Sequence, residues 1–547
     1  MTLILKVVTS AALAAAALWT ATGVPVTPAA PWAGSSSQVE QVADTLSPAS
    51  MLGQIVATSS DVQDLDDLVS RGRIGRIEVD GGTIEDHLER VNTWQDRSPF
   101  PVHIAAPSRT LGLPFSDSPG YSSPLALEAT GRPDLAYMTG EALATASRPL
   151  SVQTPGTSIV VGGPLQTFDV DRHPAAESLV RGVRAGQVLP SARLEGAGDL
   201  DALATLSNAG LMEVRLTIED AQDVDLIRSI KQQGVFTGLI VAETNDRASY
   251  ALEAVAEGAD VVQSRAPGVV FDSLARGIED GRLTLARARD ASTRVLSAKV
   301  WAGLDLAPPP PTTGQEGSVT SLQIRPWRPI DTSLRRRTGL LEGEVARRSI
   351  TVLQEEDGPL PVVGTSAPPS VFTVVLDPAA DPDRALPFVN TLATGLTSSR
   401  VSYTRLGLGL EQSDYETALE VARGSDLVVI AAFADTDGLL ASRHFAVADQ
   451  LLRLGKTIVW ASIGPASLST GLPPSDAHVL AYQTTRGAQL AAAHAITGRL
   501  EVGGTLPIAV AGAYGVGNGR QIQQEALRPG SPAEAGLDAG ATARIDG

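Results

Sequence analysis

The regular alternation of apolar, strand-like runs with helical stretches between Leu46 and Leu304 constrains the fold of this chain more than any other feature. Strands that alternate with helices form a parallel sheet with crossover helices. So many repeats within about 250 residues are typical of a β/α barrel. The predicted strands are Gly75–Val79, Val102–Ala105, Ser158–Val161, Leu189–Arg193, Glu213–Leu216, Gly238–Val241 and Val261–Gln263.

The barrel is expected to end with a helix over Leu283–Lys299, where small and apolar residues recur at helical spacing. A run of prolines, Pro308–Pro311, and a Thr/Gly/Ser-rich stretch follow it. This composition stays extended and rarely joins a core. We therefore predict a barrel domain over residues 34–306 and a linker over residues 307–338.

Strand-like and helical runs resume after Gly339 and predict a second, smaller domain over residues 339–512. Its expected fold is a three-layer α/β/α sandwich, with a helix at Tyr415–Ala422 among others. Residues 513–547 are rich in Gly, Ala and Gln and are expected to form a tail. The predicted strands are Val371–Leu376, Val401–Thr404, Leu427–Ala432, Thr457–Ser462 and Val479–Tyr482.

The N-terminus has the features of an export signal. Lys6 precedes an uncharged, Ala-rich run from Val7 to Val24, and a Pro/Ala segment follows it. Cleavage after Ala29 would place small residues at the expected positions, although nearby prolines crowd the site. The run is also nearly long enough to span a membrane, so an uncleaved anchor over residues 1–33 is the alternative. Either way, we expect an exported protein of the periplasm or cell envelope, or a secreted one.

Charge and residue usage exclude several classes of function. The formal net charge of −18 repels nucleic acid and anionic membrane surfaces. The absence of cysteine excludes disulfides, thiolate metal sites and a cysteine nucleophile. No His/Asp/Glu cluster has the spacing of a metal site, and no glycine-rich phosphate loop precedes a helix. We therefore expect no cofactor and no nucleic-acid partner.

Several segments, in the same order and spacing, resemble glycoside hydrolase family 3. Leu46–Gln54 is similar to the opening helix of the family, and Pro124–Tyr137 to its "A-L-G-A-T-x-D-P-x-L-A-Y" segment. Glu257–Asp260 resembles "A-G-A-D", Gly281–Leu285 resembles "G-R-L-S", and Gly503–Ile508 is similar to the closing "G-x-L-P-V" strand. The subgroup it resembles most is the bacterial β-N-acetylglucosaminidases. The resemblance implies a two-domain retaining glycosidase, which needs a carboxylate nucleophile about 5 Å from a proton donor.

The resemblance places Glu243 at the family's nucleophile position. The family has an aspartate there, in a "V-V-S-D-D" run after a barrel strand, where this chain has Leu239–Asp246. The extra methylene of glutamate would move the carboxylate by more than about 1 Å, a shift that can lower the rate by about a hundredfold. The alternative is a solvated glutamate beside a helix cap formed by Asn245 or Asp246.

The proton donor of the subgroup is absent from its expected place. The family's "K-H-F-P-G-H-G-D" loop corresponds to Ala192–Asp199, and no histidine occurs between His173 and His444. Glu195 or Asp199 could substitute only if burial raised its pKa, because an exposed carboxylate stays ionised at neutral pH. The subgroup's catalytic pair therefore cannot form from this stretch.

Positions that hold the sugar in the family are also changed. The aspartate of "D-Q-E-G-G" corresponds to Pro107, and the arginine of "R-S-F-G" to Gln166, a candidate for substrate binding. Arg193 is a second candidate, because its planar guanidinium suits an anionic group such as a peptidoglycan carboxylate. The alternative is that Arg193 pairs with Glu195, Asp199 or Asp201.

Other histidines have simpler predicted roles. His103 lies at a strand end and is expected to be a satisfied core residue rather than a ligand. Arg443 and His444 lie on a predicted loop at the usual ligand edge of an open α/β sheet.

Two functions remain after this comparison. The first is a non-catalytic envelope protein that binds a cell-wall glycan or an envelope protein. The second is an active retaining β-N-acetylglucosaminidase or related β-glycosidase with Glu243 as nucleophile. The enzyme requires Glu243 to face a pocket with a second carboxylate about 5 Å away, whereas the binding protein predicts a filled cleft.

Overall fold

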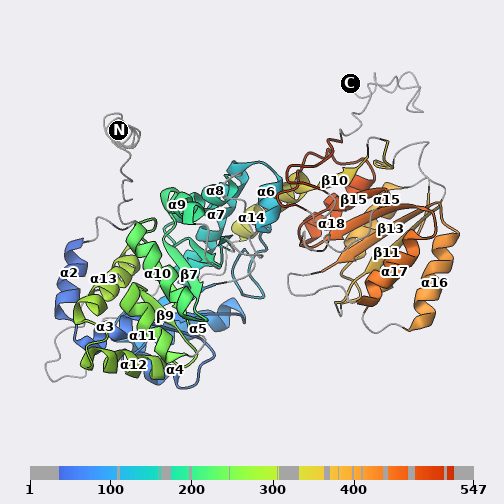
Figure 1. Cartoon of the computed structure of the whole chain (residues 1–547). Helices are drawn as coiled ribbons and strands as arrows, with labels where there is room; N and C mark the ends of the chain where they lie inside the picture. Colours follow the sequence, from blue (N-terminus) through green and yellow to red (C-terminus); the bar gives the residue numbers. More distant parts are fainter. Residues whose placement is uncertain are drawn as a thin grey trace, which may run out of the picture. The chain divides into compact units, whose positions relative to one another are not determined.

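The computed structural model contains two compact units (Figure 1). The first consists of Met1–Pro124 and Arg132–Leu341, and the second of Leu125–Gly131 and Glu342–Gly547. The structure describes residues 32, 36–107, 111–157, 159–161, 174–195, 200–244, 247–304, 306, 332–355, 357–362, 370–379, 381–396, 399–407, 411–434, 442–465, 468, 475–509 and 514–522. Apart from Trp32, the predicted signal or anchor segment over residues 1–33 lies outside the described residues. Among the described helices, none has the length and apolar character to cross a membrane.

The first unit holds a parallel sheet in the order β4-β3-β2-β1-β9-β8-β7-β6-β5. All seven strands predicted for this unit are present, with ends that agree to within two residues. The strands are Val56–Ser59 (β1), Arg76–Glu78 (β2), His103–Ala106 (β3), Thr154–Pro155 (β4), Ile159–Val161 (β5), Ser191–Leu194 (β6), Glu213–Thr217 (β7), Leu239–Glu243 (β8) and Val261–Gln263 (β9).

The two end segments of this sheet are neighbours in the chain. β4 pairs with β3, β5 pairs with β6, and only residues 156–158 separate β4 from β5. The stretch from Thr154 to Val161 therefore bridges the two ends of the sheet, and the nine segments form a curled, TIM-like barrel. This confirms the predicted fold of the first unit.

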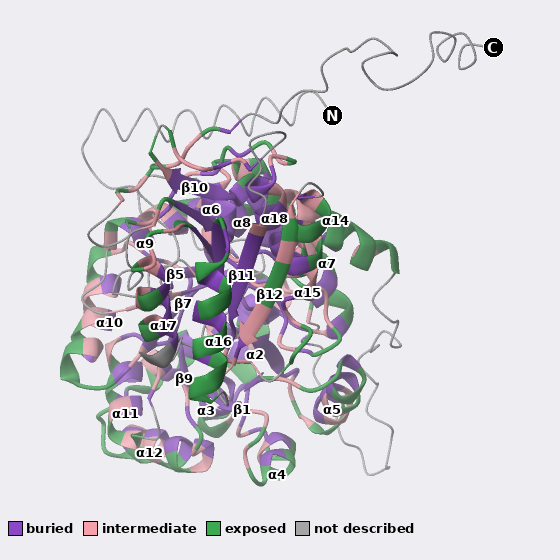
Figure 2. Cartoon of the chain, turned by 90° about the vertical axis from the view of Figure 1, so that its right-hand side faces the viewer, coloured by how far each residue is buried: buried purple, intermediate pink, exposed green. Residues whose placement is uncertain are grey.

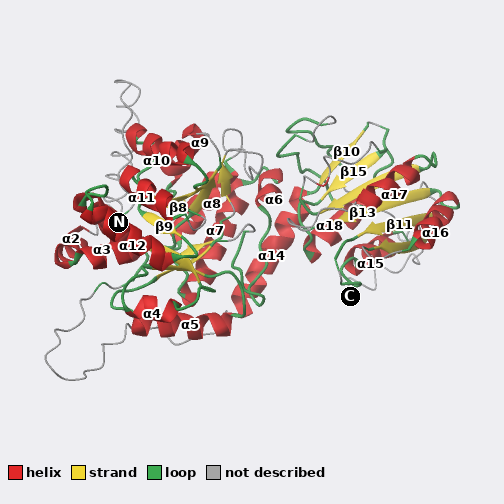
Figure 3. Ribbon diagram, turned by 60° about the horizontal axis from the view of Figure 1, so that its bottom comes forward, coloured by secondary structure: helices red, strands yellow, loops and turns green. Residues whose placement is uncertain are grey.

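Helices surround the strands of the first unit (Figure 3). The predicted closing helix is present as α13, which Thr284 caps through a hydrogen bond from Arg287 N at 3.1 Å. The other helices are Ser36–Thr45 (α2), Pro48–Ile55 (α3), Leu65–Ser70 (α4), Ile84–Arg97 (α5), Pro133–Ser147 (α7), Ala175–Ala185 (α8), Leu200–Ala209 (α9), Ala221–Gln233 (α10), Ala248–Glu257 (α11) and Pro267–Glu279 (α12), with α13 at Leu285–Trp301.

Asp260, directly before β9, connects this strand to α10, α13 and β8. Its carboxylate is fully buried and accepts bonds from Arg294 Nε at 3.0 Å, Arg287 Nη2 at 3.1 Å and Lys231 Nζ at 3.4 Å. Ile240 N also donates to it at 3.1 Å. The "A-G-A-D"-like segment therefore has a structural role in this chain.

The second unit contains a six-stranded sheet in the order β10-β15-β14-β13-β11-β12, parallel except for β10 against β15. Successive residues of β13 alternate between two apolar cores: Val429 and Ala431 face one, Val428 and Ile430 the other. Helices α15 and α18 contribute to the first core and α16 and α17 to the second, which confirms the three-layer fold. The elements are Pro124–Ala129 (α6), Thr351–Gln354 (β10), Ser370–Leu376 (β11), Leu386–Gly395 (α15), Arg400–Leu406 (β12), Gln412–Arg423 (α16), Leu427–Phe433 (β13), Ser442–Leu452 (α17), Thr457–Ile463 (β14), Ala477–Leu480 (β15) and Arg486–Ile496 (α18).

Burial follows the position of each strand in this sheet. Figure 2 shows β11 as buried, whereas β12, at the sheet edge, is largely intermediate or exposed. A central strand packs against helices on both faces and pairs along both edges, so its sequence is a continuous run of apolar residues.

Two segments differ from the domain limits expected from composition. Helix α14 spans Thr332–Ser349, so the last residues of the predicted linker are helical. Residues 514–522, at the start of the predicted tail, bond to the second unit through Arg520 N to Val352 O at 2.8 Å and a bridge between Val502 and Ile522.

Candidate functional site

The carboxyl ends of β6, β7 and β8 bring two of the predicted site residues together. The register pairs Thr217 of β7 with Glu243 of β8, and Arg193 of β6 with Arg215 of β7. Because alternate residues of a strand share a face, these four side chains lie on the same side of the sheet. The carboxyl ends of barrel strands form the face on which TIM-barrel enzymes place their active sites.

Glu243 is held by two arginines. Arg193 donates from Nη1 to Oε2 at 2.7 Å and from Nη2 to Oε1 at 3.0 Å. Arg215 donates to Oε1 from Nε at 2.8 Å and from Nη2 at 2.6 Å. The Glu243 side chain is 13% exposed, so the expectation of a solvated glutamate is wrong. The sequence could not show the two guanidinium groups that remove it from water.

The arginines also set the charge state of Glu243. Burial alone would raise its pKa, but the positive charges of Arg215 and Arg193 and their hydrogen bonds outweigh burial and lower the pKa to about 2. Glu243 is therefore ionised at neutral pH and cannot act as a general acid there. Its oxygens already accept four charged hydrogen bonds, which withdraw the electron density that a nucleophile needs.

The ion pairs continue into the barrel. Arg215 also binds Glu78 through Nη1 at 2.7 Å and Nη2 at 2.9 Å. Arg76 binds Glu213 through Nη1 at 2.5 Å and Nη2 at 2.9 Å. These four inner side chains are at most 8% exposed. We call the six residues Arg76, Glu78, Arg193, Glu213, Arg215 and Glu243 the barrel ion network; its formal charge is zero.

The barrel ion network occupies space that branched apolar side chains usually fill in this fold. Taking charges out of water is costly, so such a network is stable only while every member keeps its partner. The network therefore fixes Glu243 in place, because moving its carboxylate would leave Arg215 with an unmatched contact in a dry environment.

Two more buried polar residues of the first unit have lowered pKa values. His103 is buried and its Nε2 lies 2.9 Å from Thr154 Oγ1, which confirms it as a satisfied core residue. Burial first, and then Arg76 and Lys299, lower the pKa of His103 well below its usual value. Lys299 of α13 is buried and donates to Gln54 Oε1 at 2.6 Å, and burial lowers its pKa to about 7.

The remaining predicted positions have separate outcomes. Arg193 pairs with Glu243, whereas the sequence suggested Glu195, Asp199 or Asp201. Asp199, Gln166, Asn245 and Asp246 lie outside the described residues. We did not predict the four charged side chains inside the barrel, Arg76, Glu78, Glu213 and Arg215. The sequence did contain a signal for them, because charges alternate within apolar strands in Arg76-x-Glu78 and Glu213-x-Arg215.

The second unit does not place His444 on a ligand-facing loop. His444 belongs to α17, is fully buried, and its Nε2 lies 3.1 Å from the carbonyl oxygen of Leu406. The expected position at an exposed ligand edge is therefore wrong for His444: the α17 helix begins two residues earlier than it. The side chain of Arg443 lies outside the described part.

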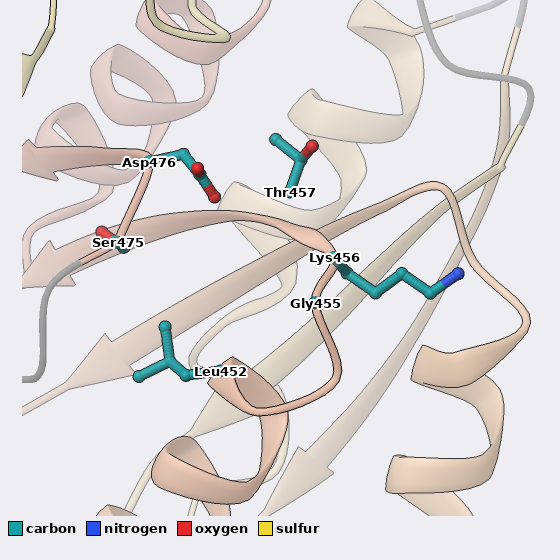
Figure 4. A pocket seen from close by; sticks show the side chains of 6 residues that line it. All are labelled: Leu452, Gly455, Lys456, Thr457, Ser475 and Asp476. Carbon is teal, nitrogen blue, oxygen red and sulfur yellow. The ribbon is translucent and has the colours of Figure 1, made fainter.

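An open hollow lies at the amino ends of β14 and β15 (Figure 4). Its polar residues include Lys456, Ser475 and Asp476. The Lys456 side chain points away from the carboxylate of Asp476, which accepts a bond from Ile458 N at 2.8 Å. The hollow therefore brings no reactive groups together. Within the described ranges, no group of three His, Asp or Glu side chains could hold a metal ion.

Comparison with known proteins gives a match in structure only. No protein-family profile matches the sequence, and no curated protein matches it. The solved structure "Beta-glucoside phosphorylase BglX" is similar with a TM-score of 0.69 and 16% identity, over 89% of this chain and 98% of that chain. A glycoside hydrolase family 3 β-N-acetylglucosaminidase from Paenibacillus sp. str. FPU-7 is similar with a TM-score of 0.66 and 16% identity, over 84% and 98%. A β-glucosidase from Listeria innocua is similar with a TM-score of 0.63 and 13% identity, over 87% and 76%. The chain therefore has a glycoside hydrolase family 3-like fold.

Proposed function

We propose that this chain is a non-catalytic, exported cell-envelope protein that uses a glycoside hydrolase family 3-like fold to bind a glycan or a protein partner. One observation carries the proposal: the carboxylate of Glu243, at the nucleophile position, is bound by both Arg193 and Arg215. Export rests on Lys6 and the apolar run from Val7 to Val24.

The state of the described histidines and glutamates of the barrel supports the same proposal. Retaining hydrolysis needs a group that is protonated near neutral pH beside the scissile oxygen. The described histidines of the first unit are His87 and His103, both buried with lowered pKa values, that of His87 to about 4. Glu78 and Glu213 are each bound by an arginine. Neither described histidine of the first unit is therefore suited to donate a proton at neutral pH, and both glutamates are already paired.

The alternative is an active retaining β-N-acetylglucosaminidase or β-glycosidase. It is favoured by the position of Glu243 at the carboxyl end of β8 and by its ionised state. Similar structures carry the names of a phosphorylase, glucosidases and acetylglucosaminidases. Phosphate as well as water therefore belongs in the test as an acceptor.

The test is turnover of aryl β-N-acetylglucosaminide and aryl β-glucoside, with and without inorganic phosphate. The proposal predicts no release of the aryl group above the buffer rate, from protein whose circular dichroism shows it folded. The matched variant is Glu243→Gln, and the control is Glu253→Gln on the exposed face of α11. Turnover that Glu243→Gln abolishes and Glu253→Gln leaves intact would establish the enzyme instead.

A further inference from the structure

Five strands of the barrel carry one partly buried polar residue at the carboxyl end, or next to it in β6. Ser59 of β1, Arg193 of β6, Thr217 of β7, Glu243 of β8 and Gln263 of β9 are each intermediate in exposure, and every other residue of these strands is buried. The register places β6 to β9 and β1 side by side in this order. We call these five residues the mouth ring.

The two arginines that bind Glu243 use their donors differently. A guanidinium has two forks that each match a carboxylate: one between Nη1 and Nη2, and one between Nε and Nη2. Arg215 fills both, with Glu78 on the first and Glu243 on the second. Two carboxylates therefore share one arginine in this barrel.

Arg193 fills only one fork. Its Nη1 and Nη2 bind Glu243, and Nη1 also binds Thr217 Oγ1 at 3.0 Å. Its Nε has no acceptor among the residues that the structure describes, and the side chain is 34% exposed. The fork between Nε and Nη2 of Arg193 is thus open at the barrel mouth. Arg215 uses the corresponding fork to bind Glu243.

The rest of the mouth ring is suited to hydroxyl groups. Thr217 and Ser59 carry hydroxyls, and Gln263 Nε2 lies 3.4 Å from Ser59 Oγ, a long contact that a ligand can replace. Neutral donors and acceptors of this kind bind sugar hydroxyls without adding charge. We propose that the mouth ring binds a sugar acid, whose carboxylate occupies the open fork of Arg193 while its hydroxyls contact Ser59, Thr217 and Gln263.

This inference rests on the proposed function, because it requires Glu243 to stay paired with the arginines instead of attacking a sugar. The carboxylate chemistry could come from a uronic acid or from the lactyl group of a muramyl sugar. Both are planar carboxylates on a pyranose, attached directly at C5 in a uronic acid and through an ether at C3 in a muramyl sugar.

The experiment is calorimetric titration of the full chain with glucuronate, N-acetylmuramic acid, N-acetylglucosamine and inorganic phosphate. The proposal predicts binding of one or both acids and at least about tenfold weaker binding of the neutral sugar, since a bidentate charged contact contributes more than about 1.4 kcal/mol. Comparing the two acids identifies the source of the carboxylate. Equal binding of the neutral sugar, or binding of phosphate alone, would overturn the proposal.

Two variants test the open fork itself. Arg193→Lys keeps the charge and removes both forks, so acid binding should weaken about tenfold, whereas Arg181→Lys on the exposed face of α8 should change it less than about twofold. Methyl-ester forms of the acids need no protein variant and should bind as weakly as the neutral sugar. Unchanged affinity in Arg193→Lys, or for the esters, would overturn the proposal, whatever the turnover assays show.

Discussion

Replacing Glu243 by glutamine is expected to destabilise the first unit strongly. The folded protein lowers the pKa of Glu243 from 4.5 to about 2. Each pKa unit corresponds to about 1.4 kcal/mol, so the ionised carboxylate contributes about 3 kcal/mol to the free energy of unfolding at pH 7. A glutamine of the same shape keeps the packing and loses this contribution.

The pH dependence gives the same prediction a second test. The pKa of Glu243 is lower in the folded chain than the value of 4.5 in the unfolded chain. Its ionised carboxylate therefore stabilises the fold fully above pH 4.5, and this stabilisation is lost as pH falls towards 2. The difference between wild type and Glu243→Gln should therefore shrink from about 3 kcal/mol at pH 7 to about 1.4 kcal/mol at pH 3.

Urea denaturation, followed by circular dichroism and by tryptophan fluorescence, measures this difference, with the exposed Glu253→Gln as control. Residues kept for catalysis usually reduce stability, so neutralising a nucleophile leaves a protein as stable as before or more stable. A Glu243→Gln variant as stable as wild type at pH 7 would refute the structural role of the barrel ion network.

Three further substitutions probe the buried charges. Arg215→Met leaves Glu78 without its bidentate partner and should cost about 3–5 kcal/mol in urea denaturation, whereas Arg228→Met, at an exposed pair, should change stability little. Folding lowers the pKa of Lys299 from 10.5 to about 7, so between these pH values the unfolded chain binds more protons than the folded chain. The free energy of unfolding of the wild type should therefore rise by up to about 1.4 kcal/mol per pH unit from pH 7.5 to 10, and Lys299→Met should lose this slope. Asp260→Asn leaves three cations around a neutral group and should lower the free energy of unfolding by about 3 kcal/mol or more; a stable variant would contradict the role given to Asp260.

Periodicity predicted the strands of both units because most of them are apolar runs between turn residues. It missed β1, since Val56 follows the last residue of α3 without a turn to mark the change. It missed β4, a two-residue strand that contains Pro155, because proline argues against a strand. It also missed β10, which pairs only with β15 at the sheet edge.

The sequence predicted where the candidate site lies, but it did not predict which side chains bind Glu243. The resemblance placed Glu243 after a barrel strand, and β8 ends at that residue. The partners of Glu243 could not be predicted, because Arg193 and Arg215 lie 50 and 28 residues away in the chain and meet it only when the sheet curls. Contacts of this kind depend on strand register, which the pattern of one strand does not specify.

The most direct test of the central claim is intact-mass measurement after incubation with activated fluoro-sugars, a 2-fluoroglucoside and a 5-fluoro-N-acetylglucosaminide. A retaining glycosidase forms a covalent bond between its nucleophile and the sugar, and the fluorine slows the release of this intermediate. The account predicts that the mass of the protein stays unchanged. A sugar adduct that maps to Glu243 and is absent from Glu243→Gln would contradict it and establish a working nucleophile.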